Sequence, residues 1–286
     1  MTGAAQFSDV TGVDVVASAS LKFENGTLAS LGCSTRLAQD SRLRRRVAIK
    51  MLDRSRADAR DGHALLQEAR VGAALNHPSI CGVHEVGHLD GEPFIVMEHV
   101  SGVSLAAAIP REAGFSLEVA LNYQIQIVAA VAHAHRHGVV HGDLTSTNIM
   151  IDRNDRVKVL DFGLAVRCVA ESESTQGETV HSRRVSAACG TVPYMAPELL
   201  RGQLADSRSD VWALGVILFE MMRGRRPFRG ATSYEVAAAI LTGRRGQLTA
   251  DVPAAVRLLV SRCLAARRED RFRSACDLAA ALDDIP

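Results

Sequence analysis

Three oxygen-bearing side chains in the middle of this chain have the types and spacing to handle a phosphate together with a metal ion. Asp143, Asn148 and Asp161 lie in polar stretches around two short apolar segments, which are joined by a turn at 152–155. This pattern predicts a small hairpin whose ends carry all three side chains. Carboxylate and amide oxygens are hard ligands that suit Mg²⁺ shared with phosphates. For any one of these residues alone, the alternative is an ordinary polar residue in a solvated turn.

A buried charge pair is expected upstream of this hairpin. The segment Arg45–Leu52 is typical of an apolar strand with Lys50 on it, and apolar residues at three- and four-residue steps predict a helix over 61–75. Glu68 lies on the inward stripe of that helix, where a carboxylate needs a partner. Lys50 is the one lysine on a nearby apolar strand, so we expect the two to pair. The alternative is a glutamate on a solvated helix face.

The strand-like and helical patterns divide the chain into two parts. Residues 1–20 carry weak signals and are interpreted as a partly disordered extension. Residues 21–286 form one domain with two lobes, 21–100 and 101–286, because the pattern becomes helical after Ser101-Gly102. Further strands are expected in a hairpin around Asn25-Gly26 and at 34–39, 83–89 and 93–99. Helices are expected from Leu117 to Gly138, in a fully buried stretch at 211–222, and around 234–241, 254–264 and 275–282.

Composition limits the function classes. The chain has 286 residues, 47% of them hydrophobic, and a formal net charge of +1. This balance gives no electrostatic reason to expect nucleic acid or an anionic membrane as a partner. Six scattered cysteines without metal-site spacing indicate free thiols in a reducing compartment. The sequence shows neither a signal-peptide pattern nor an apolar run long enough to span a bilayer, so we expect a cytoplasmic protein.

The order of these segments resembles that of the eukaryotic-type protein kinases, particularly the bacterial serine/threonine kinases, from about Leu21 onward. Seven motifs in one order are much more specific than any one of them. The resemblance implies a two-lobed α+β fold with a small β-rich N-terminal lobe and a larger helical C-terminal lobe. The motifs are Val47-Ala48-Ile49-Lys50, Glu68, His141-Gly142-Asp143 with Asn148, Asp161-Phe162-Gly163, Gly190-Thr191 with Ala196-Pro197-Glu198, Ser209-Asp210-Val211-Trp212-Ala213-Leu214-Gly215, and Arg271.

The resemblance also implies roles in ATP-dependent phosphoryl transfer to a protein substrate. Lys50, positioned by Glu68, would hold the ATP phosphates. Asn148 and Asp161 would hold Mg²⁺, with Mn²⁺ as an alternative ion. Asp143 would orient the substrate hydroxyl and accept its proton.

Further contacts are implied for the adenine and for the acceptor. Adenine would lie between Ala48 and Met150, with its edge against the backbone of Glu98 to Val100 and with Met97 behind it. Plain core packing is the alternative for both methionines. The resemblance also implies that Thr191 lies near the catalytic aspartate, which favours serine or threonine as acceptor, and that Glu198 pairs with Arg271.

The sequence departs from the family pattern in three places, and two of them, the phosphate-covering loop and Thr145, predict a slow kinase. Counting back from Lys50 places Leu28, Ser30 and Cys33 at the glycine positions of the phosphate-covering loop, so either the register is shifted or the loop is degraded, and bulkier residues there keep the backbone away from phosphate. Gly142 stands where the family has arginine. Thr145 stands where it has a lysine that contacts the γ-phosphate, and a hydroxyl supplies no such charge.

Two other functions stay open at this point. One is a pseudokinase scaffold with weak or no catalysis. The other is a small-molecule phosphotransferase, since His-Gly-Asp-Leu with a downstream asparagine also resembles the aminoglycoside-phosphotransferase loop. The Ala-Pro-Glu triplet and the Ser209–Gly215 motif count against the latter. A regulatory partner or a homodimer is open as well.

Overall fold

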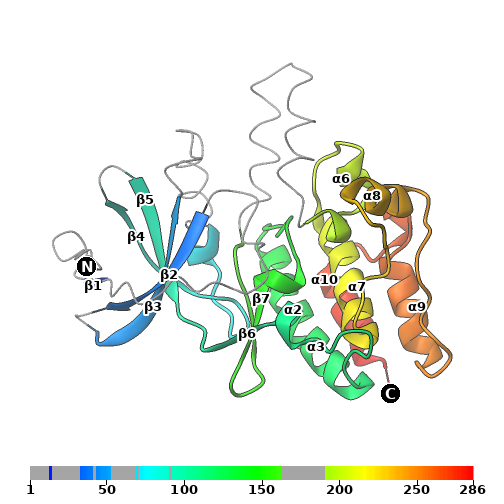
Figure 1. Cartoon of the computed structure of the whole chain (residues 1–286), viewed down its shortest axis with the longest axis horizontal. Coiled ribbons are helices and arrows are strands. Elements are labelled where there is room, and N and C mark those ends of the chain that lie inside the picture. The colour runs from blue at the N-terminus through cyan, green and yellow to red at the C-terminus, as the bar shows by residue number, and fades with distance from the viewer. Residues whose placement is uncertain are drawn as a thin grey trace. The chain divides into compact units, whose positions relative to one another are not determined.

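The computed structural model describes residues 13–14, 33–40, 43–52, 69, 71–89, 92–162 and 191–285. The chain divides into two compact units, one of residues 1–76 and 81–100, the other of residues 77–80 and 101–286. A sheet dominates the described part of the first unit, and helices dominate the second (Figure 1). The predicted α+β class with a small β-rich part and a larger helical part is confirmed. The extension at 1–20 and the lobe limits at 21–100 and 101–286 stay predictions.

The first unit contains a five-stranded antiparallel sheet in the order β1-β2-β3-β5-β4. The strands predicted at 34–39, 45–52, 83–89 and 93–99 appear, with ends that shift by at most one residue. The two-residue β1 pairs with β2 and falls within the stretch for which the sequence indicated only weak structure. The strands are β1 (Val13–Asp14), β2 (Cys33–Asp40), β3 (Arg45–Leu52), β4 (Val83–Leu89) and β5 (Glu92–Glu98).

Alternation along β3 separates an apolar face from the face that carries the predicted site residues. Val47 and Ile49 are buried in a cluster with Phe94 and Val96 of β5, and Met51 packs against it. Because successive strand residues point to opposite faces, Ala48 and Lys50 are directed away from this cluster.

Part of the predicted N-terminal structure lies outside the described residues. This applies to the hairpin around Asn25-Gly26 and to most of the helix predicted over 61–75, including Glu68. The described end of that helix, 71–74, is helical. The expected pair between Lys50 and Glu68 therefore stays a prediction.

Most helices of the second unit begin at polar caps that the sequence supplies; the exceptions are the two that follow Ala196 and Pro253. Asp206 accepts bonds from the backbone N–H groups of Arg208 and Ser209, and the Ser209 side chain completes a capping box. The same helix ends at Gly224, whose left-handed φ of 62° favours glycine. The helices are α2 (Leu105–Ala108), α3 (Leu117–Arg136), α6 (Pro197–Leu200), α7 (Ser207–Arg223), α8 (Ser233–Leu241), α9 (Ala254–Cys263) and α10 (Ala275–Asp283).

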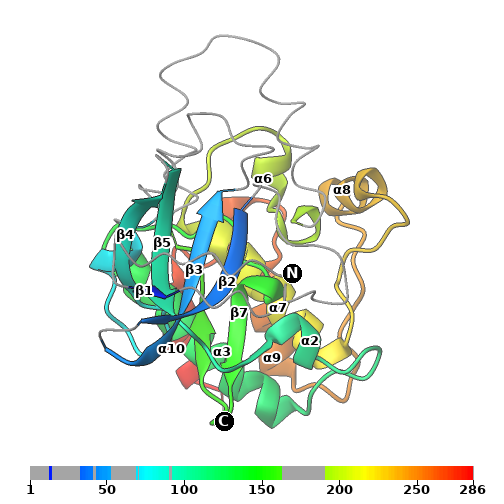
Figure 2. The same cartoon turned by 60° about the vertical axis from the view of Figure 1, so that its left-hand side comes forward.

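Helix α7 is the centre of this unit, as its nearly continuous apolar sequence predicts. It packs against α3, α9 and α10 (Figures 1 and 2). At Gly215 an added Cβ would lie 2.5 Å from Cβ of Cys263, so glycine lets α7 and α9 approach closely. Within the described residues, no helix is both long enough and apolar enough to cross a membrane.

A small antiparallel sheet, ordered β6-β7-β8, completes the second unit. Its strands are β6 (Gly102–Ser104), β7 (Ile149–Asp152) and β8 (Val157–Val159). Residues 77–80 belong to this unit because Ile80 bridges to Val159 and the Val159 N–H donates to Ser79 O at 2.8 Å.

Candidate active site

The predicted hairpin is confirmed as β7 and β8, and side chains hold its turn rigidly. Oδ1 of Asp152 accepts bonds from two backbone N–H groups in the turn. From α3, Tyr123 donates its hydroxyl to Asp155 Oδ1 at 2.9 Å. Gln126 adds two bonds in the manner of a peptide group, accepting from the Val157 N–H at 2.9 Å and donating to Asp155 O at 3.3 Å. The hairpin that carries the site residues is thus hydrogen-bonded to α3.

The loop 141–148, which we call the catalytic loop, leads into this hairpin and is held by one buried carboxylate of α7. Asp210 Oδ2 accepts from the His141 N–H at 2.8 Å, and Oδ1 accepts from the Gly142 N–H at 2.9 Å. Gly142 has a φ of 74°, a conformation that glycine adopts without steric cost. Burial alone would raise the pKa of Asp210, but the bond from His135 and the other donors around it hold the pKa below its ordinary value.

His141 connects the catalytic loop to the segment that carries Asp161. Its Nδ1 accepts from the Asp143 N–H at 3.3 Å, so the ring carries its proton on Nε2 and donates to Leu160 O at 2.9 Å. The ring also packs against Phe162, with centroids 4.8 Å apart.

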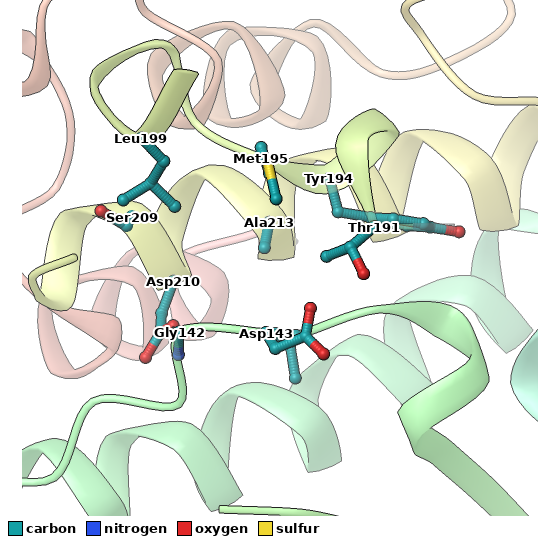
Figure 3. A pocket seen from close by; sticks show the side chains of 10 residues that line it. Gly142, Asp143, Thr191, Tyr194, Met195, Leu199, Ser209, Asp210 and Ala213 are labelled. Atoms are coloured by element: carbon teal, nitrogen blue, oxygen red, sulfur yellow. Dashed lines mark hydrogen bonds between the residues drawn. The ribbon is translucent and has the colours of Figure 1, made fainter. Parts of the chain in front are cut away.

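Asp143 faces Thr191 across a small cavity, as Figure 3 shows. The Thr191 hydroxyl donates a hydrogen bond to the Asp143 carboxylate. Burial raises the pKa of Asp143, the charge of Asp161 adds to the rise, and His141 together with the bonds from Thr191 and Asn148 offsets part of it. A carboxylate with a raised pKa is better matched to proton transfer near neutral pH than an ordinary aspartate.

Asn148 and Asp161 lie at the two ends of the hairpin and have the donor chemistry of a magnesium site. The Asn148 amide nitrogen donates to Asp143 O at 2.9 Å, which leaves the amide oxygen as the ligand atom. Asp161 has a left-handed φ of 59°, an uncommon conformation for a residue with a side chain and one that concentrates at functional sites.

Among the described residues, no group of three or more His, Cys, Asp or Glu side chains is arranged to hold a metal. Magnesium in nucleotide sites uses one or two protein oxygens and completes its shell with phosphates and water. The pair Asn148 and Asp161 fits that requirement.

The predicted pair between Glu198 and Arg271 is confirmed as a buried bidentate ion pair. The guanidinium donates to the two carboxylate oxygens at 2.7 and 2.8 Å, and Ser209 Oγ donates to Oε1 at 3.1 Å. Burial by itself would raise the pKa of Glu198, and Arg271 more than offsets this, so the pKa is lowered. The pair fixes the chain just after the segment that contains Thr191.

Comparison with known proteins agrees with this arrangement. The profile of the protein kinase domain matches residues 31–280. This chain belongs to the protein kinase family.

The similar kinases are bacterial. The serine/threonine-protein kinase PknB of Mycolicibacterium smegmatis is 35% identical over 277 residues, which cover 91% of this chain and 42% of that protein. The serine/threonine-protein kinase PrkC of Bacillus subtilis is 36% identical over 251 residues, which cover 85% of this chain and 37% of that protein. The chain thus spans roughly two fifths of the length of these relatives. Both relatives are named serine/threonine kinases.

These similarities bear on the alternatives raised by the sequence. The relatives are named serine/threonine kinases, so the pseudokinase alternative receives no support. A match to the protein kinase domain over most of the chain also favours a protein kinase over a small-molecule phosphotransferase.

Thr145 of this kinase has a local structural role that the sequence did not indicate. Its side chain is 4% exposed and caps the 3₁₀ turn η1 (Ser146–Asn148), accepting from the Asn148 N–H at 3.3 Å. Its hydroxyl also lies 2.7 Å from Thr147 Oγ1. Thr145 supplies no positive charge to the kinase site, as the sequence indicates.

Two predicted ATP-binding residues of the first unit, Ala48 and Lys50, lie on β3. Lys50 is buried, with Thr35 and Ile95 as its cross-strand partners. Ala48 is half-buried beside Met97, which is itself buried.

The backbone of Glu98 to Val100 is the segment expected to contact the adenine edge. The Glu98 N–H donates to Gly82 O at 2.8 Å, and the Cys81 thiol lies 3.5 Å from the Glu98 carbonyl oxygen. Val100 is half-buried, as is Met150 in the second unit, which lies on the face of β7 opposite the buried Ile149 and Ile151. The roles of Glu98, Val100 and Met150 toward adenine stay predictions.

Sequence reasoning missed three residues that shape the kinase site: His135, Ser146 and Tyr194. His135 Nε2 lies 2.8 Å from Asp210 Oδ2, and Ser146 Oγ lies 2.7 Å from Tyr194 Oη. Each contact joins residues at least 48 positions apart, so no local pattern could have indicated it.

Proposed function

We propose that this chain transfers the γ-phosphoryl group of ATP to serine and threonine hydroxyls of protein substrates. The observation that carries the proposal is the contact between the Thr191 hydroxyl and the raised-pKa carboxylate of Asp143 (Figure 3). It supports a proton acceptor held beside the place that a substrate hydroxyl of similar size would take. The names of the similar kinases point to the same acceptors.

In this proposal Asp143 orients the incoming hydroxyl and accepts its proton. Asn148 and Asp161 would hold Mg²⁺, with Mn²⁺ as the alternative ion, and the ion would offset negative charge on the phosphates. Lys50 with Glu68 would hold the phosphates, and Ala48, Glu98, Val100 and Met150 would contact adenine. These assignments follow the family pattern on matching residues of this sequence.

We expect slow turnover, because the proposed site lacks one cation and has a phosphate-covering loop without the family's glycines. Removing one preorganised donor from such a site costs about 10²–10³ in rate. Protein kinases turn over at about 1–100 per second. This kinase is therefore expected at about one per second or below. The protein substrates, a regulatory partner or homodimer, and a cytoplasmic location stay proposals.

The test is transfer of labelled phosphate from ATP to a mixed peptide library, in Mg²⁺ and separately in Mn²⁺. Wild type should label serine and threonine, and Asp143→Asn should reduce the rate by at least about 10² while ATP still binds. Asp251→Asn is the matched control, since it makes the same change at an exposed position before α9. Phosphotyrosine as the main product would refute the acceptor assignment. No transfer by well-folded wild type that still binds ATP would indicate a pseudokinase.

A further inference from the structure

A second hydroxyl contact joins the catalytic loop to the segment that follows Thr191. Ser146 Oγ lies 2.7 Å from Tyr194 Oη, and the Ser146 side chain is 1% exposed. Tyr194 belongs to the 3₁₀ turn η3 (Val192–Tyr194), which starts at Thr191. Water cannot replace a contact buried to this degree, so its loss would leave a polar group without a partner.

The direction of each hydrogen bond in this cluster follows from the carboxylate at its end. Tyr194 donates to Glu220 Oε2 at 2.7 Å, and Glu220 also pairs with Arg226 at 3.6 Å. Burial and the nearby Glu220 charge raise the pKa of Tyr194, so the phenol keeps its proton. Tyr194 has only that one proton to donate, so the Ser146 hydroxyl donates to the tyrosine oxygen.

The two contacts are matched in spacing. Thr191 and Tyr194 are bridged by a backbone bond from the Tyr194 N–H to Thr191 O at 2.9 Å, which makes residues 191–194 one turn. Asp143 and Ser146 are likewise three residues apart on the catalytic loop. The turn is therefore held to the loop at its first residue by Asp143 and at its last by Ser146.

Residues 192–194 of the 191–194 turn are buried and pack against α7 and α8, and the two side-chain contacts hold the turn to the catalytic loop. The second contact, between Ser146 and Tyr194, also connects the catalytic loop to α7 through Glu220. In Figure 3, Thr191 and Tyr194 lie on the side of the cavity opposite Asp143. An acceptor hydroxyl that enters the cavity would be held between that side and the Asp143 carboxylate.

We propose that Ser146 is a positioning residue for the protein acceptor: its hydroxyl holds the 191–194 turn at the distance from Asp143 that a substrate serine or threonine requires. The inference rests on the proposed function and deepens it. Ser146 touches neither ATP nor the transferred group in this account. Its loss should impair transfer to a peptide much more than transfer to water, which needs no positioned acceptor.

The experiment compares peptide phosphorylation with the slow hydrolysis of ATP by the same enzyme. Ser146→Ala should lower kcat/KM for the peptide about three- to tenfold, the range that loss of one hydrogen bond produces. ATP hydrolysis and the KM for ATP should stay within about twofold of wild type. Tyr194→Phe removes the other partner and should give the same split. The double variant should lose no more than the larger single loss, because residues acting through one contact are not additive.

Val256→Ala is the control for a general structural effect, because it shortens a fully buried side chain of α9, a helix that supplies no residue to the cavity lined by Asp143 and Thr191. It should lower the melting temperature while the ratio of peptide transfer to hydrolysis stays at the wild-type value. An equal fall of transfer and hydrolysis in Ser146→Ala, or additive losses in the double variant, would overturn the inference while leaving the proposed function intact. A wild type that hydrolyses ATP but phosphorylates no peptide would overturn both.

Discussion

Asp210 of α7 and His135 of α3 form a buried pair, with 2.8 Å between Oδ2 and Nε2, that supports the backbone of the catalytic loop. The same carboxylate accepts from the N–H groups of His141 and Gly142. His135 Nδ1 accepts from the Ala275 N–H at 3.1 Å, so its proton is on Nε2 and points at the carboxylate. Three donors therefore meet one acceptor-only group.

Replacing that group by an amide should destabilise the protein. In Asp210→Asn the side-chain NH₂ must face at least one of the three donors, so a buried donor loses its partner. We expect the free energy of unfolding to fall by about 1–3 kcal/mol, and kcat to fall with it because the catalytic loop loosens. Urea unfolding measures the first effect, with exposed Asp251→Asn as the matched control. Unchanged stability would show that His135, His141 and Gly142 hold the loop without the carboxylate.

The Asp143 carboxylate should determine the acid side of the pH–rate profile. Only ionised Asp143 accepts a proton, and its pKa is raised, so kcat/KM should fall on acidification at a higher pH than an ordinary aspartate would give. The Thr191 hydroxyl stabilises the ionised form. Thr191→Val should therefore raise the pKa further and move the acid limb to higher pH, whereas Thr191→Ser should not. A limb that stays in place or moves to lower pH in Thr191→Val would contradict this assignment.

A cluster of three histidine rings should make the second unit sensitive to acid. His133 lies between His77 and His137, with ring centroids at 5.3 and 4.4 Å, near Arg136 and Lys158. Burial, followed by repulsion from the neighbouring rings and cations, lowers the pKa of His77 and His133 in the folded state.

The unfolded chain therefore binds protons more readily than the folded one at these sites. Their contribution to stability is complete above the unfolded pKa of about 6.5 and is lost as pH falls through the lower folded values. His133→Phe keeps an aromatic ring between His77 and His137 and removes one titrating group. Urea unfolding between pH 7.5 and 5.5 should show a shallower loss of stability in this variant than in wild type. Equal slopes would exclude a contribution from His133.

The metal assignment predicts a melting shift that depends on Asp161. Since its φ is left-handed, asparagine is the suitable replacement, because it tolerates that conformation better than alanine does. ATP with Mg²⁺ at about 100 times the dissociation constant should stabilise wild type by about 2.7 kcal/mol. Asp161→Asn should abolish the part of the shift that requires Mg²⁺ while melting normally without nucleotide. A Mg²⁺-dependent shift of wild-type size in the variant would place the ion elsewhere.

Thr145→Lys tests whether a missing cation limits the rate. The ammonium should raise turnover tenfold or more with little change in ATP affinity. The structure adds a cost, since Thr145 caps η1, and loss of a cap destabilises by about 1 kcal/mol. Turnover and urea unfolding should therefore change in opposite directions. An unchanged or lower rate in a folded variant would mean that another cation already serves the phosphates.

Local pattern in the sequence was sufficient for the longer described strands and helices and for the hairpin that carries Asn148 and Asp161, but not for the short elements β1, β6, α2 and α6. Strand alternation gives β3 its two faces, and the apolar stretch of α7 predicts its central position, because burial imposes these periods residue by residue. The resemblance to kinases supplied the pair of Glu198 and Arg271 and the place of Thr191 beside Asp143.

Only the tertiary structure decided how the catalytic loop is held. The contacts of Asp210 with His135, and of Ser146 with Tyr194, join residues 75 and 48 positions apart. A single hydrogen bond between distant side chains leaves no period or spacing in the sequence. It depends on helix packing that brings α3, α7 and the 191–194 turn within bonding distance, and that packing is set by the whole core rather than by any local segment.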